Sequence, residues 1–214
     1  MIATLFDFNG VLIDDEAVHL AAFREVVAPL GIAFDDAAYE ERYLGFDDAG
    51  AFAAILRDHG KTGDVAALIE AKKPVYMRRI AAEMNVFEGA KEIVLRRAAL
   101  GTVGIVSGAL RHEIEHALGV LGVRDRVAFI VSAEDTKECK PHPEGYLLGL
   151  AALGRGPEGV VVIEDSLAGI AAAKHAGLRC AAVAHSYSEE KLRRAGADVV
   201  AARLAELTDA MIDG

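Results

Sequence analysis

The sequence has only two cysteines, Cys139 and Cys180, and neither belongs to a Cys-x-x-Cys motif. Two cysteines are too few for a disulfide framework, and reduced thiols are usual in cytosolic proteins. The first ten residues, MIATLFDFNG, contain no basic segment, and the most apolar stretch, AALGTVGIVSGAL, is short and interrupted by glycines. A secretory signal and a transmembrane helix each require a longer pattern. We therefore expect a cytoplasmic protein that does not span or bind a membrane.

Basic residues are fewer than acidic ones. The chain has 23 Lys and Arg residues against 33 Asp and Glu residues, which gives a net charge of −10. Nucleic acids and anionic membranes bind basic surfaces, so this balance argues against both as partners. With 214 residues, 53% of them apolar, the chain is long enough for one well-buried domain and a smaller one. We expect it to be a monomer.

Short apolar runs alternate with helical patterns over most of the chain. The runs cover residues 2–8, 101–107, 127–132, 159–165, 178–184 and 197–201, and their continuous apolar character is typical of buried parallel strands. Segments 89–100, 109–121, 142–153 and 166–177 have apolar residues three and four apart, as helices packed on a sheet do. The alternation predicts an α/β fold with a Rossmann-like, doubly wound parallel sheet.

One long stretch departs from this alternation. From Asp15 to about Glu83 no strand pattern occurs, and four consecutive segments have helical spacing. Aspartates near three of the segment starts are typical helix N-caps. We predict that residues 15–83 form an inserted α-helical cap over the carboxyl edge of the sheet, and that residues 1–14 and 84–214 form the catalytic core.

Acidic residues follow two of the predicted strands. In an open parallel sheet, ligands bind beyond the carboxyl ends of the strands. Asp7 ends the first strand, where a carboxylate could attack an electrophile and form an aspartyl-phosphate. Glu164 and Asp165 end the strand 159–165 and offer oxygen ligands for a hard divalent ion. Each of these acids alone is more often a helix cap or a solvated side chain.

Two further strand ends carry residues suited to phosphate. Ser107 and the backbone N–H groups of Gly108 and Ala109 follow the strand 101–107, where we expect a helix N-terminus that binds anions. Lys140 lies in the segment KECKPHP and could supply a fixed positive charge. A nucleophile, an anion-binding turn, a cation and an acidic pair at four strand ends favour a catalytic site over four unrelated turns.

Four segments, DFNGVLID, VSGA, KPHPEGY and IEDSLAGIAAAKHAG, resemble the four motifs of the haloacid dehalogenase superfamily. The closest likeness is to its helical-capped branch, which includes β-phosphoglucomutase and phosphoglycolate phosphatase, and it extends over essentially the whole chain. The resemblance implies a phosphatase that uses Mg²⁺ and an aspartyl-phosphate to hydrolyse a small phosphorylated metabolite. It implies that Asp7 is the nucleophile, that Ser107 and Lys140 hold phosphate, and that Mg²⁺ binds Asp7, the Asn9 carbonyl, Glu164 and Asp165.

Asn9 stands where the family has a second aspartate, which acts as general acid and base. An amide cannot relay a proton near neutral pH, and such assistance is typically worth about 10²- to 10⁴-fold. Three interpretations remain open. The protein could be a phosphatase for substrates that leave without a proton or that receive one from another group, or a phosphate-binding protein with little turnover. It could also catalyse a different reaction, although the family's dehalogenases lack the acidic pair formed by Glu164 and Asp165.

His19 is a candidate for the replacement proton carrier, because an imidazole titrates in the required range. A solvated helix histidine is an equally good interpretation. Asp48 falls at the position of the mutase's phosphate-binding arginine, which weakens the interpretation as a β-phosphoglucomutase-like mutase. Other cations of the cap could replace that arginine, although a solvated helix face explains them as well; they are Lys72, Lys73, Arg78 and Arg79.

Overall fold

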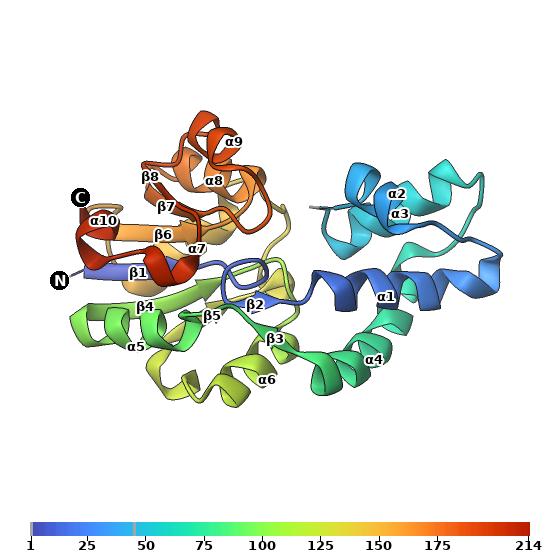
Figure 1. Ribbon diagram of the computed structural model, residues 1–214, viewed down its shortest axis with the longest axis horizontal. Coiled ribbons are helices and arrows are strands. Elements are labelled where there is room, and N and C mark those ends of the chain that lie inside the picture. Colours follow the sequence, from blue (N-terminus) through green and yellow to red (C-terminus); the bar gives the residue numbers. More distant parts are fainter. Residues whose placement is uncertain (1, 45) are drawn as a thin grey trace. The chain divides into compact units, whose positions relative to one another are not determined.

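The computed structural model describes residues 2–44 and 46–214, apart from the side chains of residues 81–83 (Figure 1). The chain divides into two compact units, one formed by Met1–Asp14 and Val86–Gly214 and the other by Asp15–Asn85. No helix within the described residues is both long enough and apolar enough to cross a membrane.

A parallel six-stranded sheet forms the centre of the first unit. Its strands are β1 (Ile2–Phe6), β4 (Gly101–Val106), β5 (Phe129–Val131), β6 (Val160–Glu164), β7 (Arg179–Val183) and β8 (Val199–Ala201). They lie in the order β5-β4-β1-β6-β7-β8, and every neighbouring pair is parallel. The sheet is parallel and doubly wound, as the sequence predicts, and the direction of winding reverses between β1 and β6. The crevice at such a reversal is where ligands bind in these sheets.

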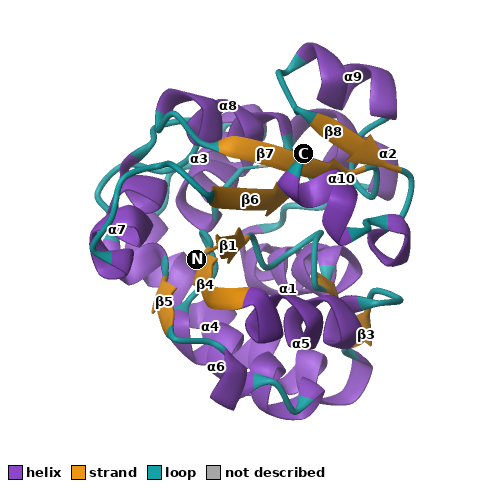
Figure 2. Ribbon diagram, turned by 90° about the vertical axis from the view of Figure 1, so that its left-hand side faces the viewer, coloured by secondary structure: helices purple, strands orange, loops and turns teal. Residues whose placement is uncertain are grey.

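Helices cover both faces of the sheet, as the end-on view in Figure 2 shows. One face holds α7 (Glu144–Leu153), α8 (Leu167–His175) and α9 (Glu189–Arg194); the other holds α5 (Ala90–Leu100), α6 (Arg111–Leu121) and α10 (Asp209–Asp213). Alternate residues of β1 point to opposite faces, so Leu5 packs with Tyr146 and Leu150 of α7. Short 3₁₀ turns lie at Arg124–Arg126, Ala133–Asp135 and Leu204–Glu206.

A buried arginine joins the opposite face of β1 to the end of the chain. Arg97 of α5 is 1% exposed, and its Nε donates to Thr4 Oγ1 at 2.9 Å. Its two other nitrogens donate to Asp209 at 3.1 Å and to Asp213 at 2.6 and 3.1 Å. The short C-terminal helix is therefore attached to the sheet by charge-assisted hydrogen bonds, which are stronger than neutral ones.

We expect Arg97→Met to lower the free energy of unfolding by about 2–4 kcal/mol, because buried Thr4 loses its donor and Asp213 loses its cation, whereas Asp209 keeps its ion pair with Arg96. A urea titration followed by circular dichroism measures this change. Arg126→Met is the control: Arg126 is 57% exposed and its ion pair with Asp125 spans 3.3 Å, so we expect less than about 0.5 kcal/mol. Equal losses of stability in the two variants would show that the contacts of Arg97 with Thr4, Asp209 and Asp213 do not stabilise the fold.

The second unit contains α1 (Glu16–Val27), α2 (Asp36–Arg42), α3 (Asp48–Asp58), α4 (Val65–Glu83) and a 3₁₀ turn at Ala28–Leu30. An aspartate comes directly before three of these helices and accepts backbone N–H groups of their first turns: Asp35 before α2, Asp47 before α3 and Asp64 before α4. These contacts are the N-caps that the sequence predicts. Aromatic and aliphatic side chains, among them Phe23, Tyr39 and Phe52, form the core of this unit. That this unit caps the carboxyl edge of the six-stranded sheet stays a prediction.

Two short strands mark the places where the chain passes between the units. β2 (Ile13–Asp14) and β3 (Asn85–Val86) pair with each other in a separate two-stranded sheet. The pairing is extended by the Phe87 N–H, which donates to the Leu12 carbonyl at 3.2 Å. Strands of two residues are too short to produce a periodic pattern, so neither β2 nor β3 is predictable from the sequence.

Candidate active site

Three acidic side chains meet at the carboxyl edge of the sheet, beside the reversal between β1 and β6. Asp7 follows β1, Glu164 is the last residue of β6, and Asp165 follows it. The strands are in register, since Phe6 lies opposite Ile163 and the Asp7 N–H donates to the Ile163 carbonyl at 2.9 Å. One oxygen atom from each acid lies within 4.8 Å of the other two, and the residues are 8%, 0% and 4% exposed, respectively.

Lys140 joins this acidic cluster from the segment that precedes α7. Its Nζ lies 2.9 Å from Asp7 Oδ1 and 2.6 Å from Glu164 Oε1, and it donates to the Val106 carbonyl at 3.3 Å. A single ammonium group thereby contacts residues at the ends of β1, β4 and β6. The structure thus brings together Asp7, Lys140, Glu164 and Asp165, which lie far apart in the sequence.

The cluster has more negative than positive charge, and this imbalance alters the ionisation of its members. Burial, reinforced by the Glu164 carboxylate, raises the pKa of Asp7 to about 6 against the opposing effect of Lys140. Burial and the two neighbouring carboxylates raise the pKa of Asp165 well above its ordinary value. Burial disfavours the charged form of Lys140, but the carboxylates of Asp7 and Glu164 raise its pKa on balance. A divalent cation would offset the repulsion among these carboxylates.

The donor atoms available in the cluster fit such a cation. Among the described residues, Asp165 Oδ1 is buried and has no hydrogen-bond partner. Glu164 differs, because Oε1 accepts from Lys140 and Tyr146 and Oε2 accepts from the Asp165 N–H, the Ser166 N–H and the Ser166 hydroxyl. A carboxylate has about four lone-pair positions, so these five donors use the capacity of Glu164. The arrangement favours Asp7 and Asp165 as direct ligands.

Two glycines allow the backbone to approach the acids closely. Gly10 has a φ of +75°, and a Cβ there would lie 2.1 Å from Asp165 Oδ2. A Cβ on Gly169 of α8 would lie 1.7 Å from Glu164 Oε1. Any larger residue at either position would displace a carboxylate, so Gly10 in DFNG and Gly169 in DSLAGI are required by the packing of the site.

Ser107 follows β4, and its hydroxyl oxygen accepts from the Ala109 N–H at 3.2 Å. Because the oxygen accepts this bond, the hydroxyl hydrogen remains available for donation to a ligand. The expected position of the helix start is wrong by two residues: α6 begins at Arg111, with Leu110 as its N-cap, so Gly108 and Ala109 lie in the loop before it. The Leu110 N–H donates to Glu113 Oε2 at 2.9 Å, which satisfies the N–H of the N-cap residue.

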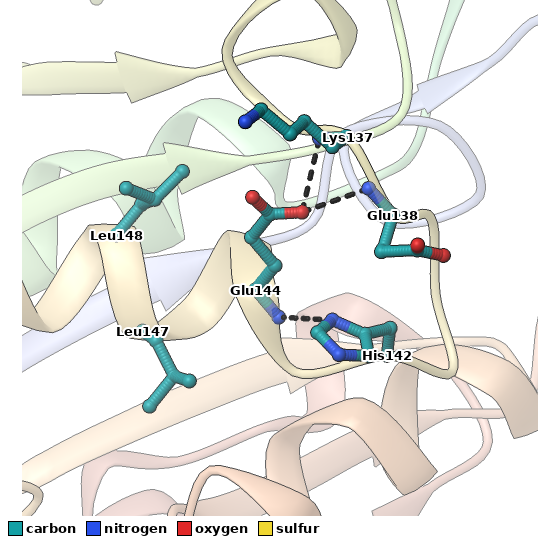
Figure 3. Close-up of a pocket in the computed structure, with 6 residues that line it drawn as sticks. All are labelled: Lys137, Glu138, His142, Glu144, Leu147 and Leu148. Carbon is teal, nitrogen blue, oxygen red and sulfur yellow. Dashed lines mark hydrogen bonds between the residues drawn. The ribbon is translucent and has the colours of Figure 1, made fainter.

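The loop that carries Lys140 is held by Glu144 at the start of α7. Glu144 Oε2 accepts from the N–H groups of Lys137 and Glu138 at 2.9 and 2.8 Å, and the Glu144 N–H donates to His142 Nδ1 at 3.3 Å (Figure 3). These bonds fix both arms of the loop around Lys140. A surface pocket of about 360 Å³ beside the loop is lined by Lys137, Glu138, His142, Glu144, Leu147 and Leu148, and by none of the predicted site residues.

His19 lies in a buried polar network of the second unit. Its Nε2 is 3.0 Å from Asp15 Oδ2, and its Nδ1 is 2.7 Å from Lys72 Nζ. An ammonium group only donates, so Nδ1 accepts and the ring proton lies on Nε2, facing Asp15. Both nitrogen atoms of His19 thus have partners inside the second unit. Its assignment as a proton carrier stays a prediction.

The cations considered for a second phosphate are paired with acids of the same unit. Lys72 is 1% exposed and forms an ion pair with Asp48. Lys73 pairs with Glu70 at 2.6 Å, and Arg78 and Arg79 both pair with Glu25, at 2.6 and 2.9 Å. Each of the four cations therefore has an acidic partner, although Arg78 and Arg79 share the single carboxylate of Glu25.

Several side chains that contact the acidic cluster have no signal in the sequence that points to the site. Tyr146 donates to Glu164 at 2.9 Å, and Ser166 both contacts Glu164 and accepts the Gly169 N–H at 2.9 Å as the N-cap of α8. Ser186 donates to Asp165, and His185 contacts the Gly10 carbonyl. The Asp-Ser pair before an apolar helix is an N-cap signal that could have indicated Ser166. The segment containing His185 and Ser186 has no comparable pattern.

Comparisons with known proteins agree with this architecture. A family model described as haloacid dehalogenase-like hydrolase matches residues 4–183. Hexitol phosphatase B of Escherichia coli is 30% identical, over 97% of this chain and 95% of its own. CbbY from Rhodobacter sphaeroides, solved with phosphate, has a TM-score of 0.87 and 30% identity, with 100% of both chains covered.

An aspartate-to-asparagine variant of CbbY has also been solved with xylulose 1,5-bisphosphate. A β-phosphoglucomutase from Clostridium difficile has a TM-score of 0.86 and 26% identity, with 98% of this chain and 95% of that chain covered. The family model spans most of the sequence and these relatives span nearly all of it, so the predicted resemblance is confirmed. The chain belongs to the haloacid dehalogenase-like hydrolase family.

Proposed function

We propose that this protein is a Mg²⁺-dependent phosphatase that hydrolyses a small phosphorylated sugar or polyol through an aspartyl-phosphate on Asp7. One observation carries the proposal: the Asp7 carboxylate lies in one buried cluster with the Lys140 ammonium and with Glu164 and Asp165. A nucleophile, a fixed cation and an acidic pair with metal-ligand spacing are the parts that phosphoryl transfer to a carboxylate requires.

In the first step, an Asp7 oxygen attacks phosphorus, an O–P bond to Asp7 forms, and the bond from phosphorus to the substrate oxygen breaks, so that this oxygen leaves with the bonding electron pair and takes up a proton from solvent. In the second step, water attacks the same phosphorus and loses a proton to solvent, which releases inorganic phosphate and restores the Asp7 carboxylate. Lys140 balances charge on the phosphoryl oxygens, and Ser107 with the Gly108 N–H donates hydrogen bonds to them. Glu164 holds Lys140 and the start of α8, through the bonds described above.

Mg²⁺ would be held by Asp7 and Asp165, with the backbone carbonyl of Asn9 as a further oxygen ligand. When bound, it would neutralise negative charge on the phosphoryl group. The buried Asp165 Oδ1 and the raised pKa values of Asp7 and Asp165 support this assignment. Glu164 would act on the metal indirectly, by orienting the turn that carries Asp165.

The class of substrate is suggested by the relatives. A hexitol phosphatase and a protein solved with xylulose 1,5-bisphosphate are both about 30% identical to this chain. A mutase would need cationic side chains for a second phosphate, whereas Lys72, Lys73, Arg78 and Arg79 are paired with acids. This pairing favours hydrolysis of a monophosphate over mutase chemistry.

We expect the purified protein to release phosphate from p-nitrophenyl phosphate and from at least one sugar or polyol monophosphate when Mg²⁺ is present. EDTA should reduce turnover at least roughly 100-fold, and added Mg²⁺ should restore it. Asp165→Asn should raise the Mg²⁺ concentration for half-maximal rate at least roughly 10-fold, since it removes a charged ligand. The control is Asp125→Asn, a side chain that is 73% exposed on the same unit.

Unchanged turnover in EDTA would contradict the metal assignment. A different result is that calorimetry detects binding of inorganic phosphate while none of the phosphate esters is hydrolysed. This result would indicate a phosphate-binding protein that has lost catalysis, which is the alternative interpretation of Asn9. The two outcomes are separable because binding and turnover are measured on the same preparation.

A further inference from the structure

The turn that follows the nucleophile is contacted from outside by one histidine. Residues 8–13 form a tight turn in which the Gly10 N–H donates to the Ile13 carbonyl at 2.9 Å and the Leu12 N–H donates to the Phe8 carbonyl at 2.9 Å. The Gly10 carbonyl is 2.7 Å from Nδ1 of His185, which lies in the loop after β7. The two residues are 175 positions apart in the chain.

The second ring nitrogen and the ring face of His185 are also fixed. The Leu204 N–H donates to His185 Nε2 at 3.3 Å, and the Phe87 ring stacks on the imidazole with 3.8 Å between centroids and 19° between planes. Nε2 must accept from an N–H and Nδ1 faces a carbonyl, so the neutral ring carries its proton on Nδ1. Burial lowers the pKa of His185, which is consistent with this neutral form.

The contact with Gly10 is also linked to the acidic cluster. A Cβ at Gly10 would lie 2.1 Å from Asp165 Oδ2, so the turn rests directly on that carboxylate. The next residue, Ser186, donates its hydroxyl hydrogen to the same Asp165 oxygen. Two consecutive residues therefore bond to the two groups that touch: His185 to the Gly10 carbonyl and Ser186 to the Asp165 carboxylate.

We propose that His185 is a positioning residue for the phosphatase reaction: by donating from Nδ1 to the Gly10 carbonyl, it fixes the Asn9–Gly10 turn beside Asp7. This inference rests on the proposed function for its effect on catalysis. His185 acts through the backbone and touches no reacting atom. Displacement of reacting groups by about 1 Å can cost roughly 100-fold in rate, so a turn that is free to move would lower turnover more than substrate binding.

Two substitutions separate hydrogen bonding from packing. His185→Phe keeps a ring that can stack on Phe87 but removes the donor to Gly10. His185→Asn loses the ring but places an amide N–H near the position of Nδ1. Phosphate release from p-nitrophenyl phosphate with saturating Mg²⁺ gives kcat and KM, and His116→Phe on α6 serves as the control.

We expect kcat of His185→Phe to fall roughly 10- to 100-fold with KM changed less than about 3-fold, and His185→Asn to stay within about 5-fold of the wild type. Wild-type kcat in His185→Phe, or an equal loss in His185→Asn, would overturn the proposal and assign His185 to packing. Wild-type protein without turnover would count against the proposed function alone.

A second measurement does not depend on turnover. Hydrogen exchange should become at least roughly 10-fold faster at the amides of Gly10 and Leu12 in His185→Phe, and stay near wild type in His185→Asn, while the amides of β1 keep their protection. Exchange at Gly10 and Leu12 that is unchanged in His185→Phe would overturn the proposal. If His185→Phe does not fold, the comparison is made between His185→Asn and His185→Gln, whose longer side chain moves the donor away from Gly10 and should give the faster exchange.

Discussion

Replacement of Asp7 by asparagine should abolish turnover, with a loss in kcat of roughly 10⁴-fold or more. The amide has nearly the same shape as the carboxylate but is a poor nucleophile, so the O–P bond to residue 7 cannot form. Removing the charge also removes repulsion between Asp7 and a phosphate dianion. Asp7→Asn also removes a charged Mg²⁺ ligand, so the comparison is made at Mg²⁺ concentrations that saturate both proteins; inorganic phosphate should then bind Asp7→Asn at least as tightly as it binds the wild type.

Chemical trapping gives a direct measurement. After mixing with a substrate labelled in its phosphoryl group and quenching in acid, the wild type should retain label on the peptide that contains residue 7, and Asp7→Asn should retain none. The Asp125→Asn variant should label like the wild type. Label on a different residue, or turnover in Asp7→Asn above one hundredth of wild type, would show that Asp7 is not the nucleophile.

Replacement of Asn9 by aspartate should have the opposite effect and raise turnover of alkyl phosphates by roughly 10²-fold or more. A strongly basic alkoxide needs a proton as its bond to phosphorus breaks, and Asn9 cannot provide one. Aryl and acyl phosphates have better leaving groups and need little help. Wild-type activity should therefore fall steeply as the leaving-group pKa rises, and Asn9→Asp should flatten that dependence.

A series of phosphate esters measured with Asn9→Asp and His19→Ala distinguishes the two sources of a proton. If His19 supplies it, Asn9→Asp changes little and His19→Ala is the damaging substitution. In the structure His19 has partners at both ring nitrogens, Asp15 and Lys72, so His19→Ala is also compared by thermal melting. A flat dependence in the wild type together with an inert Asn9→Asp would contradict the role assigned to the amide.

The sheet was predictable from the sequence because parallel strands are buried on both faces. Each strand is then a continuous apolar run, and all six runs correspond to strands, each of which is one to three residues shorter than its run. The order of the strands follows from right-handed crossovers only when the reversal point is known. Neither β2 nor β3 could be predicted, since two residues carry no periodicity.

The main residues of the site were identifiable because they stand at the ends of apolar runs. Asp7, Ser107 and the pair Glu164 and Asp165 are of this kind. Their supporting contacts were not, because His185 and Ser186 reach Gly10 and Asp165 from a loop whose sequence, AHSY, has neither periodicity nor a known turn signal. The saturation of Glu164 by five donors likewise depends on the packing of α7 and α8 on the sheet, which the linear sequence does not contain.

The pairing of β2 with β3 also bears on how such a chain can be rebuilt. Neighbouring strands lie about 4.8 Å apart. The polypeptide chain therefore leaves the first unit at Asp14 and returns to it at Val86, on two strands that are paired with each other. The entropic cost of closing a loop grows only slowly with its length. The six-stranded sheet therefore places little constraint on the length of the segment inserted between Asp14 and Val86. At this position a short turn or a domain from another protein could replace Asp15–Asn85, and the six strands would keep their order.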